Sequence, residues 1–554
     1  MKEKKIKVVI EDGDRVEKLN VNIKSKICDV VKDIDFIDDK VLGFYVNNDL
    51  KRYDAELVKD SKIIPIRLSS GDGYRLYSRT LKMVLYMALT KLYASVDVKF
   101  LTTINRDQYF ITQNIELTRD KITKIKDEMQ RIIEKDLPIT KRIVPIEEAM
   151  ELYKDANNED KLDNVGNRLK QNVSMYFCDG MYNYFYGSLA KSTGAVRVFD
   201  LMPYREGALL LMPNDNYELN KDVNVKKRLY DTFIDFNRLT DTLNIDNVGA
   251  LNDIIIKGKI NNVIQVAEAI HQRKMVELVQ NIEKRKDKVK MILIAGPSSS
   301  GKTTFAQKLG VQLELIGLHP VTISMDNYFV ERKDNPVGPD GKLDFECVEA
   351  LDRKLFNSQM RDLIQGKTVE LPRFDFIYGK KEYKGDFLKL NQNDVLIIEG
   401  IHALNPIMTE FTPDENKYKI YIAPIATLNI DGYTKVSSTD TRILRRMVRD
   451  YNTRGHKVEK TFELWQNVKK GEEKYIFPYV DTVDFVFNSS LIYEPSVMKT
   501  FAQPLLLQVD KDSIYYSEAR RLYEYLNNFL PMETGNIPVD SIVREFIGNG
   551  CFYR

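Results

Sequence analysis

Cysteine is scarce in this 554-residue chain, and its four copies are Cys28, Cys178, Cys347 and Cys551. They form no C-x-x-C pair, which excludes a disulfide scaffold and a cysteine-rich zinc module and favours a reducing compartment. Long apolar runs are also missing, because none approaches the roughly 18 residues that a membrane span needs. The basic N-terminus contains only Val8–Ile10 before acidic residues. We therefore expect a cytoplasmic protein with no signal peptide and no membrane partner.

A strong net charge is absent as well. The 83 Lys and Arg residues and 81 Asp and Glu residues leave a net charge of +2. That balance gives no general case for binding nucleic acid or an anionic membrane. Histidine is as rare as cysteine, with four copies, of which the first is His271. The chain is nevertheless long enough for several domains, each with its own core.

One motif carries chemistry on its own, a glycine-rich loop after the apolar run Val289–Ala295. Gly296, Gly301, Lys302 and Thr303 fill the G-x-x-x-x-G-K-[ST] phosphate-loop pattern. The glycines let successive backbone N–H groups turn toward phosphate oxygens, and the dipole of the following helix adds positive potential. Lys302 can reach the β- and γ-phosphates, and the Thr303 hydroxyl can ligate Mg²⁺. We expect a nucleoside triphosphate to bind at Gly296, Ser298, Ser299, Ser300, Gly301, Lys302, Thr303 and Thr304.

Two carboxylates follow later apolar runs. Pro320–Met325 predicts a strand that ends at Asp326, and Asn393–Ile398 predicts one that ends at Glu399. In a doubly wound parallel sheet, both strand ends face the same crevice as the phosphate loop. A carboxylate directly after an apolar strand is typical of the Walker B acid, so Glu399 is the expected metal ligand. Asp326 is then free to accept a proton from a substrate hydroxyl.

A run of arginines follows the second of these strands. The four are Arg442, Arg445, Arg446 and Arg449. Their spacing places them on one helix face, where they repel one another. Ion pairs with Asp440 and Asp450 would offset only part of that repulsion, and a polyphosphate would relieve the rest. The pattern favours a lid helix over the nucleotide, with Arg442 catalytic and the other three binding phosphate.

The first half of the chain has a different character. Residues 1–68 alternate in the β manner, with a turn at Glu11–Asp14 and a short helix around Ile27–Ile34. These elements indicate a small β-grasp-like α+β module. Residues 74–215 contain amphipathic helices, one of them over about Thr118–Lys135, and residues 216–287 predict a helical linker.

The order of these parts resembles the N-terminal half of threonyl-tRNA synthetase, a TGS domain followed by an editing-type domain. The matching runs are Glu134–Ile139, Glu147–Tyr153 and Lys191–Gly194. The family's editing site uses an H-x-x-x-H pair and a C-x-G-P-H run, whereas this chain has Ser78–Met83 and Phe185–Leu189 in those places. No imidazole remains to hold zinc or activate water, and Cys178 alone is better explained as a small buried residue. We therefore expect residues 74–215 to be catalytically dead for editing and either to bind a partner such as tRNA or to be a structural appendage.

The second half resembles the uridine kinase/phosphoribulokinase family of small-molecule kinases. The matching runs are Gly296–Thr304, Ser324–Phe329, Leu343–Glu346, Leu371–Phe376, Ile398–His402, Asp440–Asp450 and Val486–Ser490. The resemblance implies that Asp326 is the general base for a nucleoside 5′-hydroxyl, that Asp344 contacts the ribose and that Phe374 packs on the base. Gly379 stands where uridine kinases have the histidine that reads the pyrimidine. Either Tyr378 replaces that histidine, or the base pocket is broader.

Together these patterns predict a multidomain protein: an N-terminal α+β half, with a β-grasp-like TGS domain and then an α+β editing-like domain, and a C-terminal α/β P-loop domain with a parallel sheet. The expected boundaries are 1–68, 74–215, 216–287 (helical linker), 288–510 (kinase-like) and 511–554, the last with a helix over Ser517–Phe529 and a tail without chemistry. The expected activity is ATP- and Mg²⁺-dependent phosphorylation of a nucleoside, uridine or cytidine.

Two alternatives stay open. One is a phosphoribulokinase-like enzyme with another small hydroxyl substrate, which the aromatic residues Phe374, Phe376 and Tyr378 disfavour. The other is an NTP-dependent RNA-binding protein linked to translation.

Overall fold

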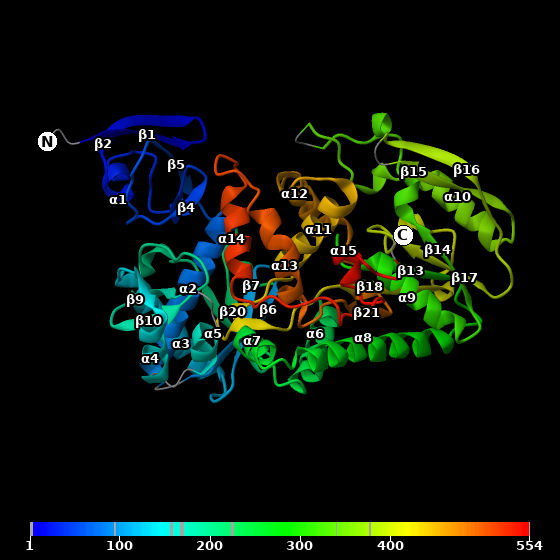
Figure 1. The fold of residues 1–554 in the computed structure, drawn as a ribbon, viewed down its shortest axis with the longest axis horizontal. Coiled ribbons are helices and arrows are strands. Elements are labelled where there is room, and N and C mark those ends of the chain that lie inside the picture. Colours follow the sequence, from blue (N-terminus) through cyan, green and yellow to red (C-terminus); the bar gives the residue numbers. More distant parts are fainter. Residues whose placement is uncertain are drawn as a thin grey trace.

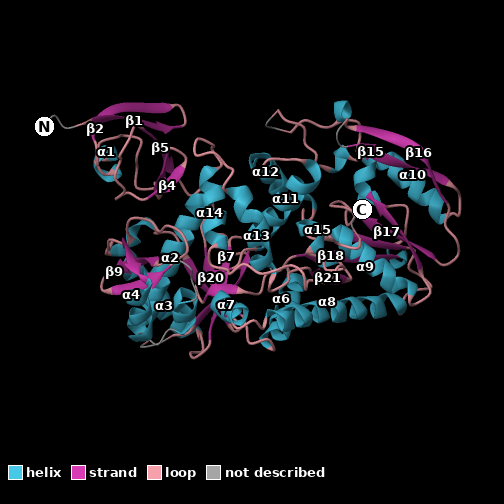
Figure 2. Ribbon diagram, in the orientation of Figure 1, coloured by secondary structure: helices cyan, strands magenta, loops and turns pink. Residues whose placement is uncertain are grey.

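The computed structural model describes residues 4–93, 96–155, 159–166, 171–222, 226–338, 341–375 and 378–552. The N-terminal sheet lies at one end of the molecule and the P-loop sheet toward the other, with helices packed around and between them (Figures 1 and 2). Within the described residues, no helix is long and apolar enough to cross a membrane.

The N-terminal sheet has the order β2-β1-β5-β3-β4. Its elements are β1 Lys5–Asp12, β2 Arg15–Asn22, α1 Ile27–Val31, β3 Gly43–Val46, β4 Asp49–Lys51 and β5 Ser61–Ile66. Alternation explains the sheet, since Ile6, Val8 and Ile10 are buried while Lys5 and Lys7 are exposed. Gly13, with φ of 64°, makes the turn between β1 and β2. The predicted hairpin and short helix are confirmed, although the helix ends at Val31 rather than Ile34.

A long helix, α2 (Gly71–Leu92), leads into the second part of the chain, and Ser70 caps it by accepting from the Gly73 N–H. The strands of this second part form two sheets, β11-β12-β7-β6 and β10-β9-β8. The elements are β6 Val98–Ile104, β7 Asp107–Thr112, α3 Arg119–Glu134, β8 Thr140–Pro145, α4 Ile146–Asp155, α5 Glu159–Gly166, β9 Asn172–Cys178, β10 Met181–Tyr184, β11 Asp200–Tyr204 and β12 Gly207–Leu211. The helix expected over Thr118–Lys135 is therefore present as α3.

Three helices connect this part to the P-loop sheet: α6 Lys227–Asp241, α7 Val248–Ile256 and α8 Ile260–Glu283. Most of the range expected to be helical, 216–287, lies in these three helices, the first of which begins at Lys227. Met275, Leu278 and Ile282 of α8 pack in one cluster with side chains of the P-loop sheet and α9. Thus α8, which runs beneath that sheet in Figure 1, is part of the layer that covers it.

The P-loop sheet has the order β14-β17-β13-β18-β21, and every pairing in it is parallel. Central β13 is buried along its whole length, which is why it reads as a continuous apolar run. The elements are β13 Met291–Ala295, α9 Lys302–Glu314, β14 His319–Ser324, α10 Arg353–Ile364, β15 Val369–Asp375, β16 Lys380–Leu388, β17 Asp394–Glu399, β18 Lys417–Ala423, β19 Asn429–Asp431, β20 Thr434–Lys435, α11 Ser438–Arg454, α12 Val458–Tyr475, β21 Phe485–Asn488, α13 Glu494–Leu506, α14 Tyr516–Leu526 and α15 Arg544–Ile547. The C-terminal parallel sheet expected from the sequence is confirmed.

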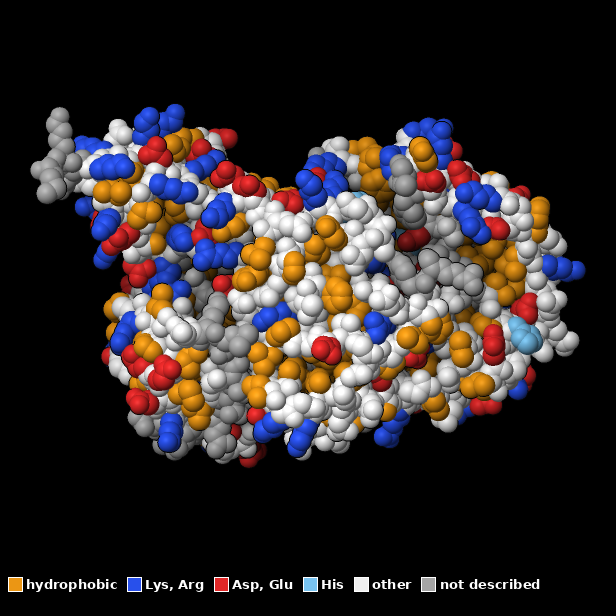
Figure 3. Space-filling view, in the orientation of Figure 1, with side chains coloured by type: hydrophobic (Ala, Val, Ile, Leu, Met, Phe, Trp, Pro, Cys, Tyr) orange, Lys and Arg blue, Asp and Glu red, His pale blue; other side chains and the backbone are white. Residues whose placement is uncertain are grey.

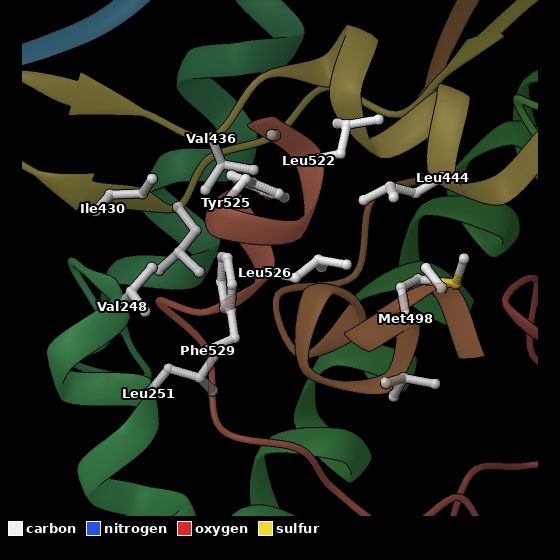
Figure 4. Packing of buried hydrophobic residues seen from close by; sticks show 14 of the residues in the cluster. Val248, Leu251, Ile430, Val436, Leu444, Met498, Leu522, Tyr525, Leu526 and Phe529 are labelled. Atoms are coloured by element: carbon white, nitrogen blue, oxygen red, sulfur yellow. The ribbon is translucent and has the colours of Figure 1, made fainter. Parts of the chain in front are cut away.

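The largest core crosses the boundaries expected from the sequence. One cluster of buried side chains contains Val173, Val248, Leu444 and Leu526, which come from four different expected segments. Figure 4 shows where its members from α7, α11, α13, α14 and the β19–β20 region meet. The apolar contacts of the kinase-like part therefore continue into the first half of the chain.

Candidate active site

The phosphate loop, residues 296–301, connects the end of β13 to the start of α9. Ser299 and Gly301 have φ of 60° and 90°, the left-handed conformation that turns backbone N–H groups into a shared concavity. A Cβ atom on Gly296 would lie 2.1 Å from the Ile422 carbonyl oxygen of β18, so only glycine fits there. Among the described residues, the buried hydroxyls of Ser299 and Ser300 have no hydrogen-bond partner. Unpaired donors around an N–H-lined turn fit a phosphate group.

Lys302 folds back over this loop. Its Nζ donates to the Gly296 carbonyl at 3.1 Å and to the Pro297 carbonyl at 3.3 Å. Burial lowers the pKa of Lys302, while Glu399, Asp326 and Glu545 act in the opposite direction. Thr303, in the first turn of α9, is exposed.

Asp326 and Glu399 follow adjacent parallel strands, because Ser324 of β14 is in register with Glu399 of β17. Both carboxylates act electrostatically on Lys302 of the phosphate loop. Glu399 is buried, and burial followed by the charge of Asp326 raises its pKa to about 7, against the opposing effect of Lys302. A buried carboxyl beside a second carboxylate fits a divalent cation, which would replace the proton.

Of the predicted acceptor residues, Phe374 lies beside the turn that carries Asp326. The Phe374 N–H on β15 donates to Asn327 Oδ1 at 3.4 Å, and its ring lies 5.6 Å from that of Phe329. Asp344 is half-buried and its carboxylate accepts the Glu346 N–H at 3.0 Å. Tyr378 is 73% exposed, whereas Phe376 lies outside the described residues.

Two further residues at the acceptor side were not found from the sequence. Gly379 has φ of 67°, and a Cβ there would lie 2.7 Å from the Arg332 Cβ, so Arg332 fills the space that a side chain at position 379 would need. Glu346 is influenced electrostatically by Asp326 and Asp344. Burial, then repulsion from Glu472, Asp326 and Asp344, raises its pKa to about 7, although Arg446 opposes the shift. Glu346 lies in the matching run Leu343–Glu346, but that run singled out only Asp344, and Arg332 lies outside the matching runs.

The arginines lie on α11 as expected, but their surroundings correct the argument for a free lid. Arg445 is fully buried, with Nε 2.5 Å from Glu494 and an N–H donated to the Ser489 carbonyl at 2.8 Å. Arg442 pairs with Glu472. The expected partner Asp440 is instead bound by Arg521 of α14 at 2.7 Å. Carboxylates from other elements therefore already offset the repulsion that was expected to require a polyphosphate.

Three of these arginines also donate hydrogen bonds to Ser298 and Ser299 of the phosphate loop. Arg442 Nε donates to the Ser298 carbonyl at 2.9 Å, and Arg446 donates to the Ser298 hydroxyl at 2.8 Å. Arg445 donates to the Ser299 carbonyl at 3.3 Å. Arg449 lies 3.0 Å from Asp450. Burial raises the pKa of Asp450, but Arg449, Arg446 and Arg454 outweigh that effect, so the pKa is lowered.

Two carboxylates that the sequence did not single out bind backbone N–H groups of the loop region. Glu472 of α12 accepts from the Ser298 N–H at 3.0 Å, and Glu545 of α15 accepts from the Thr304 N–H at 3.1 Å. They lie 174 and 241 residues from their partners. Only the tertiary fold brings them to the loop.

The positions compared with an editing site are packed with side chains. Lys82 Nζ donates at 2.9 Å to the carbonyl of Tyr433, which comes from the turn between β19 and β20. The Tyr433 ring lies 6.2 Å from that of Phe185. Cys178 is buried, and burial followed by Asp179 raises its thiol pKa to about 11, as expected for an unreactive thiol.

Comparison with known proteins places this geometry in a family context. The family model "Phosphoribulokinase / Uridine kinase family" matches residues 291–491. A uridine kinase of Macrococcus caseolyticus is 31% identical over 181 residues, which cover 33% of this chain and 78% of that protein. Uridine-cytidine kinase 2-B of Danio rerio is 28% identical over 35% of this chain and 71% of its own length. Among solved structures, D-glycerate 3-kinase of Cryptococcus neoformans matches 38% of this chain and 89% of its own, with 15% identity and a TM-score of 0.27.

Proposed function

This chain belongs to the phosphoribulokinase/uridine kinase family and is an ATP-dependent phosphotransferase, and from that premise we propose that it transfers the γ-phosphate of ATP to the 5′-hydroxyl of a nucleoside, uridine or cytidine. One observation carries the proposal. Asn327, next to the candidate base Asp326, accepts the N–H of Phe374 at 3.4 Å. An aromatic residue suited to packing on a nucleobase therefore lies beside the segment that carries the carboxylate proposed to receive the hydroxyl proton.

In this proposal each residue of the loop has one task. The N–H groups of residues 298–304 bind phosphate oxygens, which requires the Ser298 N–H to leave Glu472 and the Thr304 N–H to leave Glu545. Lys302 leaves the Gly296 and Pro297 carbonyls to contact the β- and γ-phosphates. Arg446 and Arg449 are assigned to binding the phosphates of the nucleotide, whereas fully buried Arg445 holds the loop through the Ser299 carbonyl. Arg442 keeps Ser298 in place through its carbonyl and so supports catalysis by positioning the loop.

The Thr303 hydroxyl and the Glu399 carboxylate are the residues that would hold Mg²⁺. When bound, the cation would neutralise negative charge on the phosphates of ATP. Asp326 orients the acceptor hydroxyl and accepts its proton, Asp344 contacts the ribose, and Phe374 packs on the base. Tyr378 is assigned to the outer rim of the base pocket, because it is largely exposed.

The test is a panel of nucleosides and small sugar phosphates with ATP and Mg²⁺, read by release of ADP. We expect uridine or cytidine to give the highest kcat/KM. Asp326→Asn should lower kcat by at least about 10²-fold with little change in ATP affinity. Asp334→Asn, an exposed acid in the same segment, is the matched control and should keep full activity. An Asp326→Asn enzyme with unchanged kcat, or a preference for a sugar phosphate, would refute the proposal.

A further inference from the structure

The C-terminal segment Asp540–Ile547 packs onto the phosphate loop, and α15, red in Figure 1, lies beside α9. Asp540 forms an ion pair with Lys308 of α9 at 2.9 Å. A Cβ on Gly301 would lie 2.5 Å from Ile542 Cγ2, so this side chain rests directly on the loop glycine. The Phe546 ring lies 4.8 Å from the Arg445 guanidinium. These contacts place a segment of the chain's end over the loop.

Within that segment, Glu545 occupies a backbone donor of the kind that binds phosphate. Thr304 is the third residue of α9, so its N–H has no partner inside the helix. The N–H groups at the start of a phosphate-loop helix normally receive phosphate oxygens. Here the Thr304 N–H is given to Glu545 Oε2 at 3.1 Å, and both residues are buried. A carboxylate oxygen and a phosphate oxygen cannot both accept this one hydrogen in good geometry.

The charge of Glu545 also reaches the catalytic centre. Burial dominates the pKa shifts of Lys302, which is lowered, and Glu399, which is raised, and the charge of Glu545 acts on both groups in the upward direction. A triphosphate at the loop would bring several negative charges next to this buried carboxylate, where water screens the repulsion poorly. Geometry and charge therefore both oppose simultaneous binding of Glu545 and phosphate.

We propose that segment Asp540–Ile547 is an internal competitor of the nucleotide, in which Glu545 holds the Thr304 N–H in the resting protein and must leave when ATP binds. The proposal rests on the proposed function only in placing ATP at this loop, and it is independent of the acceptor. Withdrawal of the segment, for whatever cause, would raise the affinity for ATP.

The test is ATP binding to the full chain, measured by calorimetry without an acceptor. Glu545→Gln and Glu545→Ala should tighten the Kd for ATP by about 5-fold or more, because the competing charge is removed. Glu533→Gln removes the same charge from an exposed position of the C-terminal region and should leave Kd unchanged. An unchanged or weakened Kd in folded Glu545→Gln protein overturns the proposal, since that is the result for a purely structural contact.

Amide hydrogen exchange of the unmodified protein, with and without ATP, is a second test, and it does not require any variant to fold. ATP should increase amide exchange in residues 540–547, and protection or no change there would contradict displacement of the segment. The two proposals fail separately. Tightened ATP binding without nucleoside phosphorylation would refute the acceptor, whereas normal phosphorylation with unchanged ATP binding in Glu545→Gln would refute the competitor.

Discussion

At the scale of single residues, Glu399 is a carboxyl group whose ionisation is opposed by its surroundings. Its carboxyl is buried beside Asp326, and its pKa rises from 4.5 to about 7. Between these two pH values the folded state binds a proton that the unfolded state has lost. As the pH rises from 4.5 to 7, the free energy of unfolding therefore falls by up to about 3 kcal/mol, and at lower pH this stability is fully present.

This gives a stability prediction for the protein without metal or nucleotide. Glu399→Gln keeps the shape of the side chain and removes its charge, so it should raise the Tm at pH 8 and leave it nearly unchanged at pH 5. Thermal unfolding at the two pH values, followed by circular dichroism, measures the difference. Equal shifts at both pH values would show that the charge of Glu399 is not the cause.

The same carboxyl predicts how metal dependence varies with pH. A metal ligand must be deprotonated, so protons compete with Mg²⁺ for Glu399. With a pKa of about 7, the Mg²⁺ concentration for half-maximal activity should be about 10-fold higher at pH 6 than at pH 8. Glu399→Gln is the control, because the remaining pH dependence of its residual activity reports the titration of ATP itself. The same pH dependence in both proteins would remove Glu399 as the ligand.

At the scale of elements, α11 holds the phosphate loop in place by means of buried ion pairs. Arg445 joins Glu494 of α13 to the carbonyls of Ser299 and Ser489. Arg445→Met would leave Glu494 buried without its partner, which should destabilise the fold by about 3–5 kcal/mol. The double variant Arg445→Met, Glu494→Leu should recover part of that loss. Denaturant unfolding measures both, and additive losses in the double variant would contradict a coupled pair.

Elements also show what the sequence reveals and what it does not. β13 and the loop after it were predictable because a buried parallel strand and a G-x-x-x-x-G-K-[ST] turn are local patterns. The spacing of the four arginines correctly predicted that they lie on one helix, but it did not predict that three of them are buried. Their carboxylate partners Glu472 and Glu494 come from other elements, and Glu545 reaches the loop from a tail expected to carry no chemistry. Long-range contacts of this kind leave no periodic signal in the sequence.

At the scale of the whole molecule, the two halves share polar and apolar contacts. A chain of hydrogen bonds and ion pairs runs from Tyr45 through Asp72, Arg75, Glu518 and Arg521 to Asp440 at the start of α11. Asn429 Nδ2 donates to the Phe100 carbonyl at 2.9 Å, which ties the β19–β20 hairpin to β6. Among the described residues, acidic and basic side chains are interspersed over the face shown in Figure 3. These contacts favour a structural role for the first half.

Tyr433 is the residue at which this role can be tested. Its ring packs against Tyr86, Phe100 and Phe185 of the first half, and the hairpin that carries it leads directly into α11. Tyr433→Ala should therefore destabilise the full chain by about 3–5 kcal/mol. It should also raise the KM for ATP, because α11 and the loop it holds lose a fixed anchor.

The matched control is Tyr451→Ala, which removes the same ring from an exposed position of α11 and should change stability by no more than about 0.5 kcal/mol. Urea unfolding followed by near- and far-ultraviolet circular dichroism measures stability, and ADP release measures KM. If the Tyr433→Ala protein unfolds in a separate early transition and keeps its KM for ATP, the halves are independent. If stability and KM change together, the first half acts as the support that keeps α11 against the phosphate loop.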